Sequence, residues 1–250
     1  AVEKYQLYFW LMPKAIESLD FSKYDIVISD SHSFGKGIKV PEKTLHICYC
    51  YTPTRYLWLN PKEHLKKTQF LGPLKSIAPF ILNQLKKWDL KAAKRPNVYG
   101  ATCQNVQKRI KQYYNRNSQV IYSPIDWNFW RKTKETCDFF LYVSRLEPHK
   151  RPDLAVSAFN KLGLPLKVIG VGSLKEKLEE MAGSNIEFLG EVSDRKLRDL
   201  YSQARAVVFP QEEDFGLVPL EAAACGTPTI AFKKGGSLET VVNNVTGKFF

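Results

Sequence analysis

Two glutamates in one short segment are the residues of this chain best placed to do chemistry. Glu213 and Glu221 stand eight positions apart, with Phe215-Gly216-Leu217 between them. An apolar run at 206–210 precedes them, and a helix-forming run follows. We therefore predict a strand that ends near Pro210, a glycine-containing turn that carries Glu213, and a helix whose first turns carry Glu221.

The start of that predicted helix favours an anionic ligand. In open α/β sheets, ligands bind at the edge where the parallel strands end. The free amides at a helix N-terminus attract negative charge, so a phosphate-bearing ligand suits this position.

Two cations precede this segment. Arg145 and Lys150 follow a predicted strand at 139–144, on the loop before a predicted helix. Two fixed cations can neutralise a diphosphate, and the charge that develops on it when it departs as a leaving group, without a metal. Taken alone, two solvated surface cations are the simpler interpretation. Beside the paired glutamates, the functional interpretation is favoured.

The elements that must position these residues alternate along the second half of the chain. The predicted strands are 139–144, 166–170, 186–190, 206–210 and 229–232, and the predicted helices are 153–160, 174–181, 194–204, 218–225 and 237–243. This alternation predicts an α/β fold with a parallel, doubly wound sheet. In the first half we expect strands at 24–29, 45–50, 97–102 and 120–122, and helical segments at 61–95 and 106–114.

Composition narrows the class of protein. The 250 residues are 44% hydrophobic, which is typical of a folded globular chain, and no apolar run is long enough for a transmembrane helix. The five cysteines show no metal-binding spacing, and Cys48 and Cys50 alternate within a predicted strand. We expect buried, reduced thiols and a cytoplasmic protein.

The positive charge is concentrated in the first half. Residues 1–138 hold 23 Lys and Arg against 11 Asp and Glu, whereas residues 139–250 hold 14 of each. A basic half indicates an acidic partner: anionic lipid, nucleic acid or a phosphorylated substrate.

Together these motifs resemble the signature of the retaining glycosyltransferases of family 4, which have the GT-B fold. The resemblance rests on Glu213-x7-Glu221, on Arg145 and Lys150 after a strand, and on Phe188-Leu189-Gly190 at a strand end. Further matches are Gly226-Thr-Pro228, Gly235-Gly236 with Glu239, and the segment 246–250. The segment 46–58, with Trp88-Asp89 and 92–95, is similar to a subgroup of bacterial mannosyltransferases that build O-antigen and other surface polysaccharides.

The resemblance implies a role for each of these residues. Glu213, Arg145 and Lys150 would be catalytic: Glu213 close to the donor sugar, and the cations on the leaving diphosphate. Glu221 would bind the ribose hydroxyls, and the amides of 215–217 would contact sugar and phosphate. Gly172 would let the chain approach the nucleotide, although Gly-x-Gly is more often a plain turn, and Phe188-Leu189 would lie under the base.

The acceptor side is predicted in the first half. His32 follows a predicted strand end, and a histidine without a role is an equally good interpretation of it. Many family members carry a histidine where this chain has Tyr51, whose hydroxyl could bind a sugar oxygen but would not titrate near neutral pH. Arg55 is a third candidate, although a lone arginine is more often structural.

The resemblance also implies the domain organisation. We expect two Rossmann-like domains: a partial N-terminal, acceptor-side domain at 1–126, a linker at 127–138, and an incomplete nucleotide-sugar-binding domain at 139–250. The family's usual first strand and its glycine-rich loop are not seen, so we expect a chain truncated at both ends. Such a first domain would expose apolar surface.

The implied function is transfer of a sugar, mannose from GDP-mannose, to a lipid-linked glycan in surface polysaccharide (lipopolysaccharide) synthesis. We expect neither a cofactor nor a metal, because no Asp-x-Asp occurs and the four histidines lie far apart. The alternatives are a non-catalytic nucleotide-sugar or nucleic-acid binding module and a different nucleotide enzyme. No RNP motif or zinc finger supports nucleic acid binding, and Gly-x-Gly-x-x-Gly and a Walker A loop are absent.

A peripheral position on the inner face of the cell membrane is a further hypothesis. Residues 62–95 carry nine Lys and Arg among apolar side chains, opposed only by Glu63 and Asp89. This face would lie on anionic lipid and meet the lipid-linked acceptor there. An amphipathic helix pair with a solvated basic face is an equally good interpretation.

Overall fold

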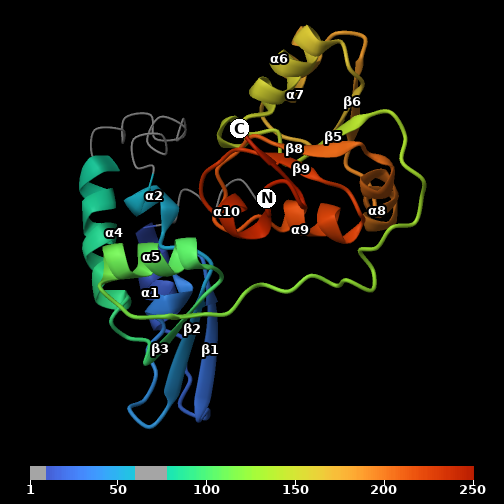
Figure 1. Cartoon of the computed structure of the whole chain (residues 1–250). Helices are drawn as coiled ribbons and strands as arrows, with labels where there is room; N and C mark the ends of the chain where they lie inside the picture. Colours follow the sequence, from blue (N-terminus) through green and yellow to red (C-terminus); the bar gives the residue numbers. More distant parts are fainter. Residues whose placement is uncertain (1–9, 60–77) are drawn as a thin grey trace. The chain divides into compact units, whose positions relative to one another are not determined.

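The computed structural model describes residues 10–59 and 78–250, and it forms two compact units (Figure 1). The first unit is Ala1–Ser123 and the second is Pro124–Phe250. Each unit contains its own parallel sheet, as expected from the alternation of strands and helices. Much of the predicted helical segment 61–95 lies outside the described residues.

The sheet of the first unit has the order β1-β2-β3-β4, with all described pairs parallel. Its elements are α1 (Met12–Glu17), β1 (Ile26–Ser31), η2 (Gly35–Gly37), β2 (Leu45–Cys50), α2 (Arg55–Trp58), α4 (Ala78–Ala92), β3 (Val98–Ala101), α5 (Gln104–Tyr114) and β4 (Gln119–Val120). The first strand extends two residues beyond the predicted 24–29. The short α2 and η2 were not predicted, since one helical turn has no periodicity to detect.

The two faces of this sheet differ. One face packs into a core that includes the free thiols of Cys48 and Cys50, confirming that both are buried. On the other face, Ile26 and Ile28 of β1 are 57% and 68% exposed. Parallel sheets usually bury both faces, so this exposed apolar surface is unusual.

The sheet of the second unit has the order β10-β9-β8-β5-β6-β7, again with all described pairs parallel. Its elements are β5 (Phe140–Val143), η4 (Pro148–Lys150), α6 (Pro152–Leu162), β6 (Leu166–Ile169), α7 (Lys175–Met181), β7 (Ile186–Gly190), α8 (Asp194–Gln203), β8 (Ala206–Phe209), α9 (Leu217–Ala224), β9 (Thr229–Ala231), α10 (Ser237–Thr240) and β10 (Gly247–Phe249). The predicted strands and helices of this half are all present, and β10 was not predicted. Each unit therefore has the predicted α/β architecture with a parallel sheet.

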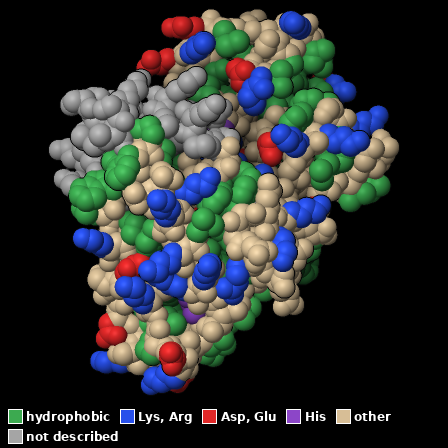
Figure 2. Space-filling model, turned by 90° about the vertical axis from the view of Figure 1, so that its left-hand side faces the viewer, with side chains coloured by type: hydrophobic (Ala, Val, Ile, Leu, Met, Phe, Trp, Pro, Cys, Tyr) green, Lys and Arg blue, Asp and Glu red, His purple; other side chains and the backbone are tan. Residues whose placement is uncertain are grey.

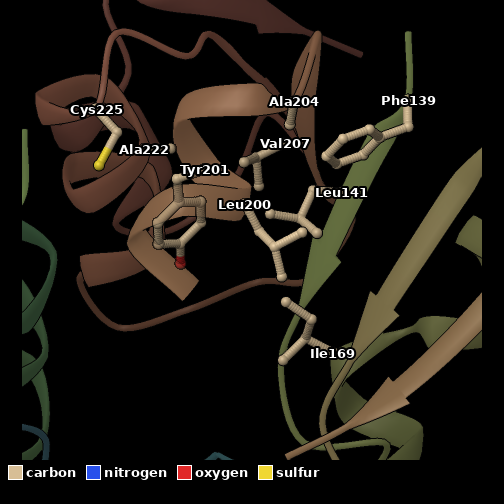
Figure 3. Close-up of a cluster of buried hydrophobic side chains, with 9 residues drawn as sticks. All are labelled: Phe139, Leu141, Ile169, Leu200, Tyr201, Ala204, Val207, Ala222 and Cys225. Atoms are coloured by element: carbon tan, nitrogen blue, oxygen red, sulfur yellow. The ribbon is translucent and has the colours of Figure 1, made fainter. Parts of the chain in front are cut away.

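Helices cover both faces of this second sheet. One buried cluster joins Leu141 of β5 to Leu200 and Tyr201 of α8 and to Ala222 of α9 (Figure 3). A second cluster joins Tyr142 of β5 to residues of α6 and α7. Neighbouring residues of β5 thus point to opposite faces, which fixes the strand as the centre of the unit.

The segment expected as a linker, 127–138, is grouped with the second unit. The Trp130 ring packs on Tyr201 in a T-shaped contact with ring centroids 5.7 Å apart. The Thr133 hydroxyl donates to Asp199 at 2.7 Å, and the Cys137 amide donates to the Gln203 carbonyl at 2.7 Å. These bonds hold the segment along α8.

None of the helices formed by the described residues is both long enough and apolar enough to cross a membrane.

Candidate active site

The order of the strands in the second unit creates a topological switch point at one edge of the sheet. The chain runs outward from β5 through β6 to β7 on one side, and from β8 through β9 to β10 on the other. The loops that follow β5 and β8 therefore leave adjacent strands in opposite directions. Such a switch point, at the carboxyl ends of parallel strands, is where open α/β sheets bind ligands.

Lys150 and Glu213 meet at this switch point. The Lys150 ammonium forms an ion pair with Glu213 Oε1, although 63 positions separate the two residues. Their side chains are only 13% and 17% exposed. Lys150 ends the turn η4, and the Tyr142 hydroxyl of β5 donates to its carbonyl at 3.0 Å. A side chain of β5 thus fixes the turn η4 and with it the position of Lys150.

The ion pair carries no net charge, so attraction of an anion to this switch point would have to come from other groups. One is the N-terminus of α9, whose first amides have no partners within the helix. Another is Arg145, which is exposed on the loop after β5 and whose guanidinium forms no hydrogen bond or ion pair with the described residues. A diphosphate could bind these groups and share Lys150 with Glu213.

The backbone around Glu213 is held by a glycine pair. The Gly236 amide donates to the Glu213 carbonyl at 2.9 Å, and Gly235 forms an isolated parallel bridge with Glu213. A side chain on Gly236 would collide with the backbone of Phe215. Gly216 then enters α9 with a φ of 94°, a conformation that favours glycine. Close packing of the two loops therefore explains Gly235 and Gly236, whereas backbone conformation explains Gly216.

Glu221 lies one turn into α9 and points toward α8. Its Oε2 accepts a hydrogen bond of 3.1 Å from the hydroxyl of Tyr201, a side chain that is fully buried. Burial raises the pKa of the Glu221 carboxyl, and the Tyr201 hydrogen bond opposes that rise. The described contacts do not connect Glu221 with Glu213.

The four side chains predicted to converge are therefore only partly brought together. Lys150 and Glu213 form a pair, whereas Glu221 binds Tyr201 and Arg145 reaches solvent. All four lie on segments that leave the carboxyl edge of one sheet. Their roles toward a ligand remain predictions.

Gly172 has a structural explanation. A side chain at this position would collide with the backbone of Leu146, in the loop after β5. The Leu146 amide also donates to the Val171 carbonyl at 2.9 Å. The loops after β5 and β6 are thus joined backbone to backbone, and contact of Gly172 with a nucleotide remains a prediction.

Phe188 and Leu189 lie at the end of β7. The pairing of β6 with β7 jumps from Phe188 to Gly190, so Leu189 is the extra residue of a β-bulge. The backbone of Leu189 is therefore left out of the ladder with β6. This is the backbone that would read the edge of a base, and such bulges are common beside active sites.

The acceptor-side candidates lie at the carboxyl edge of the first sheet. His32 is exposed directly after β1, and Tyr51 follows β2 with 39% of its surface exposed. The Tyr51 hydroxyl donates to Asp30 at 3.2 Å, and burial together with this carboxylate raises the pKa of Tyr51. Arg55 begins α2. The three residues share one edge, and their roles remain predictions.

Sequence reasoning missed three residues near these loops. Tyr142 supports Lys150, and Tyr201 binds Glu221. Gln211 follows β8 and is 2% exposed, and no described residue bonds its side-chain oxygen. None carries a motif, and the only available signal was a tyrosine, Tyr142, in an otherwise apolar predicted strand.

In the part of the chain that the structure describes, His, Cys, Asp and Glu side chains form no group of three that could hold a metal ion. Independence of a metal and of a cofactor remains a prediction about this chain.

Residues 125–250 match the family described as "Glycosyl transferases group 1". The chain is 30% identical over 150 residues to an uncharacterised glycosyltransferase of Methanocaldococcus jannaschii, covering 58% of this chain and 40% of that protein. It is 24% identical over 274 residues to the alpha-1,3/1,6-mannosyltransferase of Dictyostelium discoideum, covering 90% of this chain and 63% of that protein.

A solved structure shares the fold. The Anabaena protein HepE in complex with UDP-glucose superposes with a TM-score of 0.61 at 20% sequence identity, covering 82% of this chain and 64% of that one. The chain spans less than two thirds of the length of each of these proteins. Because the matched family covers half of the chain and the whole sheet that bears Lys150, Glu213 and Glu221, the chain belongs to the group 1 glycosyltransferases.

Proposed function

We propose that this chain forms part of a retaining glycosyltransferase that moves mannose from GDP-mannose to a lipid-linked glycan in surface polysaccharide synthesis. The observation that carries the proposal is the shielded pair of Lys150 and Glu213 at the switch point, beside the N-terminus of α9. The sequence match to a mannosyltransferase along most of the chain supports the choice of sugar.

The proposed reaction proceeds on one face of the donor. The bond between the anomeric carbon and the terminal phosphate oxygen breaks, and the acceptor oxygen bonds to the same face of that carbon. The acceptor proton passes to the departing phosphate. Lys150 and Arg145 stabilise the charge on the phosphate, and Glu213 favours the positive charge that develops at the anomeric carbon.

Charge on the first unit supports a membrane-bound acceptor. The exposed faces of α4 and α5 carry Lys87, Lys91, Lys108 and Lys111, and the exposed Lys94 follows α4. Figure 2 shows Lys and Arg side chains at the surface, among hydrophobic and uncharged ones. Several of the nine cations of the proposed membrane face fall in 60–77, outside the described residues. Anionic lipid would attract such a surface, with a strength that falls as salt rises.

Transfer of label tests the proposed reaction. The chain is incubated with radiolabelled GDP-mannose and membrane lipid extract, with UDP-glucose as the competing donor because a relative's structure holds it. We expect label in lipid from GDP-mannose, and loss of label in Glu213→Ala and Lys150→Ala. Transfer from UDP-glucose alone would show that GDP-mannose is not the donor. Undiminished transfer in both variants would overturn the assignment of Glu213 and Lys150 to the active site.

Liposome flotation tests the membrane step. We expect the chain to float with vesicles that contain phosphatidylglycerol, and to stay behind with neutral vesicles. Equal partitioning with both kinds of vesicle would contradict the proposed binding to anionic membranes.

A further inference from the structure

Only one oxygen of the Glu221 carboxylate is engaged. Oε2 accepts the hydrogen bond from Tyr201, and no described residue bonds Oε1. The side chain of Glu221 is partly buried, so rotating it away from Tyr201 would leave a buried hydroxyl unsatisfied. The carboxylate is therefore held in one orientation, with one oxygen available to a ligand.

Tyr201 is itself fixed in place. Its ring is fully buried in the cluster between β5, α8 and α9, and Figure 3 shows the hydroxyl oxygen at the edge of that cluster. Trp130 packs on this ring, and the Thr227 hydroxyl donates to the Tyr201 carbonyl. Both the ring and the backbone of Tyr201 are thus restrained, which a group that orients another side chain requires.

We propose that Tyr201, backed by Trp130, is a positioning residue that aims the free oxygen of Glu221 at a hydroxyl of the donor's ribose. The inference rests on the proposed function, because it assumes that Glu221 binds the donor. It adds a residue that touches no substrate and acts through Glu221. Holding the carboxylate before the ligand arrives reduces the entropy lost on binding.

Calorimetry with two forms of nucleotide separates positioning from simple structural support. The full chain is titrated with GDP and UDP, and with their 2′,3′-dideoxy counterparts, which lack the hydroxyls that Glu221 would bind. We expect Tyr201→Phe to weaken binding of the ribose forms by about 3- to 10-fold, the loss of one hydrogen bond, and to leave the dideoxy forms unchanged. Tyr99→Phe, another buried tyrosine whose hydroxyl donates to Ala93, is the matched control.

The pH profile gives a second readout that a merely structural role would not move. Because the Tyr201 hydrogen bond opposes the rise in the pKa of Glu221, its removal should move the acid limb of ribose-nucleotide binding to higher pH. Two other titratable groups interact electrostatically with Glu221: Asp194 of α8 and Cys225 after α9. Both are unchanged in the Tyr201→Phe variant.

The outcomes distinguish the two proposals. Equal weakening of both nucleotide forms by Tyr201→Phe, or an unmoved acid limb, would overturn the positioning role. Unchanged affinity in Glu221→Ala, or no nucleotide binding by the unaltered chain, would overturn the ribose contact and with it the proposed function. Should Tyr201→Phe fail to fold, Trp130→Phe must show a smaller loss with the same selectivity for ribose, and equal affinities would again refute the role.

Discussion

At the scale of single residues, Lys150 and Glu213 depend on each other. Each side chain is largely shielded from water, so removing one charge leaves the other buried without compensation. We expect Lys150→Met or Glu213→Gln to lower the free energy of unfolding by about 1–3 kcal/mol. Each should also lower the rate of sugar transfer by about 10²–10³-fold. Urea denaturation and the transfer assay measure these two effects.

A double-mutant cycle tests whether Lys150 and Glu213 are coupled energetically. The free-energy loss in the double variant should fall well short of the sum of the single losses, because both charges are then gone. The exposed pair of Lys175 and Glu179 is the control, and Lys175→Met should cost no more than about 0.5 kcal/mol. Additive losses at Lys150 and Glu213 would contradict the coupling.

His46 determines a response of stability to pH. Burial, with a smaller effect of Arg95, lowers its pKa from 6.5 to about 4, and its Nε2 lies 2.8 Å from the Ser29 hydroxyl. Below pH 6.5 the unfolded chain therefore binds a proton that the folded chain does not, so stability falls as pH falls toward 4. From pH 7 to pH 5 we expect a loss of about 2 kcal/mol.

The midpoints of urea unfolding at pH 7 and pH 5 measure this loss of stability. Most carboxylates stay ionised between these two pH values, so they contribute little to the difference. His46→Gln, which cannot titrate there, should lose most of the pH dependence. An unchanged pH dependence in this variant would assign the effect to other groups.

At the scale of elements, the loops after β5 and β6 depend on a glycine. Gly170 has a φ of 129°, and a side chain there would collide with the carbonyl of Ser144. Gly163 also has a positive φ, of 67°, but no atom lies within 4 Å of its would-be side chain. The two glycines therefore differ in surroundings and also in backbone conformation, because only the φ of Gly163 lies in the left-handed α region that other residues can adopt.

Alanine at each glycine compares a modest backbone cost, at Gly163, with the combined cost of backbone strain and collision, at Gly170. Gly163→Ala should cost about 1 kcal/mol from backbone conformation alone. Gly170→Ala should cost at least about 2 kcal/mol more, since the two loops must move apart. Calorimetric melting of both variants gives the comparison, and equal losses would show that the packing of the loops contributes nothing.

At the scale of the whole molecule, the two units should respond differently to a nucleotide. The proposed donor site lies within Pro124–Phe250 alone. A nucleoside diphosphate at 100 times its Kd stabilises the state that binds it by about 2.7 kcal/mol. Hydrogen exchange of the full chain with GDP should therefore slow at 144–150 and 213–221, and stay unchanged in the described residues of the first unit. Protection confined to the first unit would contradict this assignment.

Local sequence pattern determined the strands and helices of the second unit. Each depends on contacts between near neighbours, such as the cap of α8, where the Ser193 side chain accepts from the Lys196 amide at 3.4 Å. Elements of one turn, such as η4, carry too few residues to show a period. The spacing of Glu213 and Glu221 likewise indicated a helix start beside a strand end.

Only the tertiary structure decided which of these groups touch. No local signal pairs β8 with β5, yet this pairing brings Lys150 to Glu213, and the packing of α8 on α9 brings Tyr201 to Glu221. Contacts between distant segments depend on the order of strands and on the volume of the side chains between layers. The sequence alone therefore specified the chemical groups and their local elements, while the folded chain determined which carboxylate is paired with a cation and which with a hydroxyl.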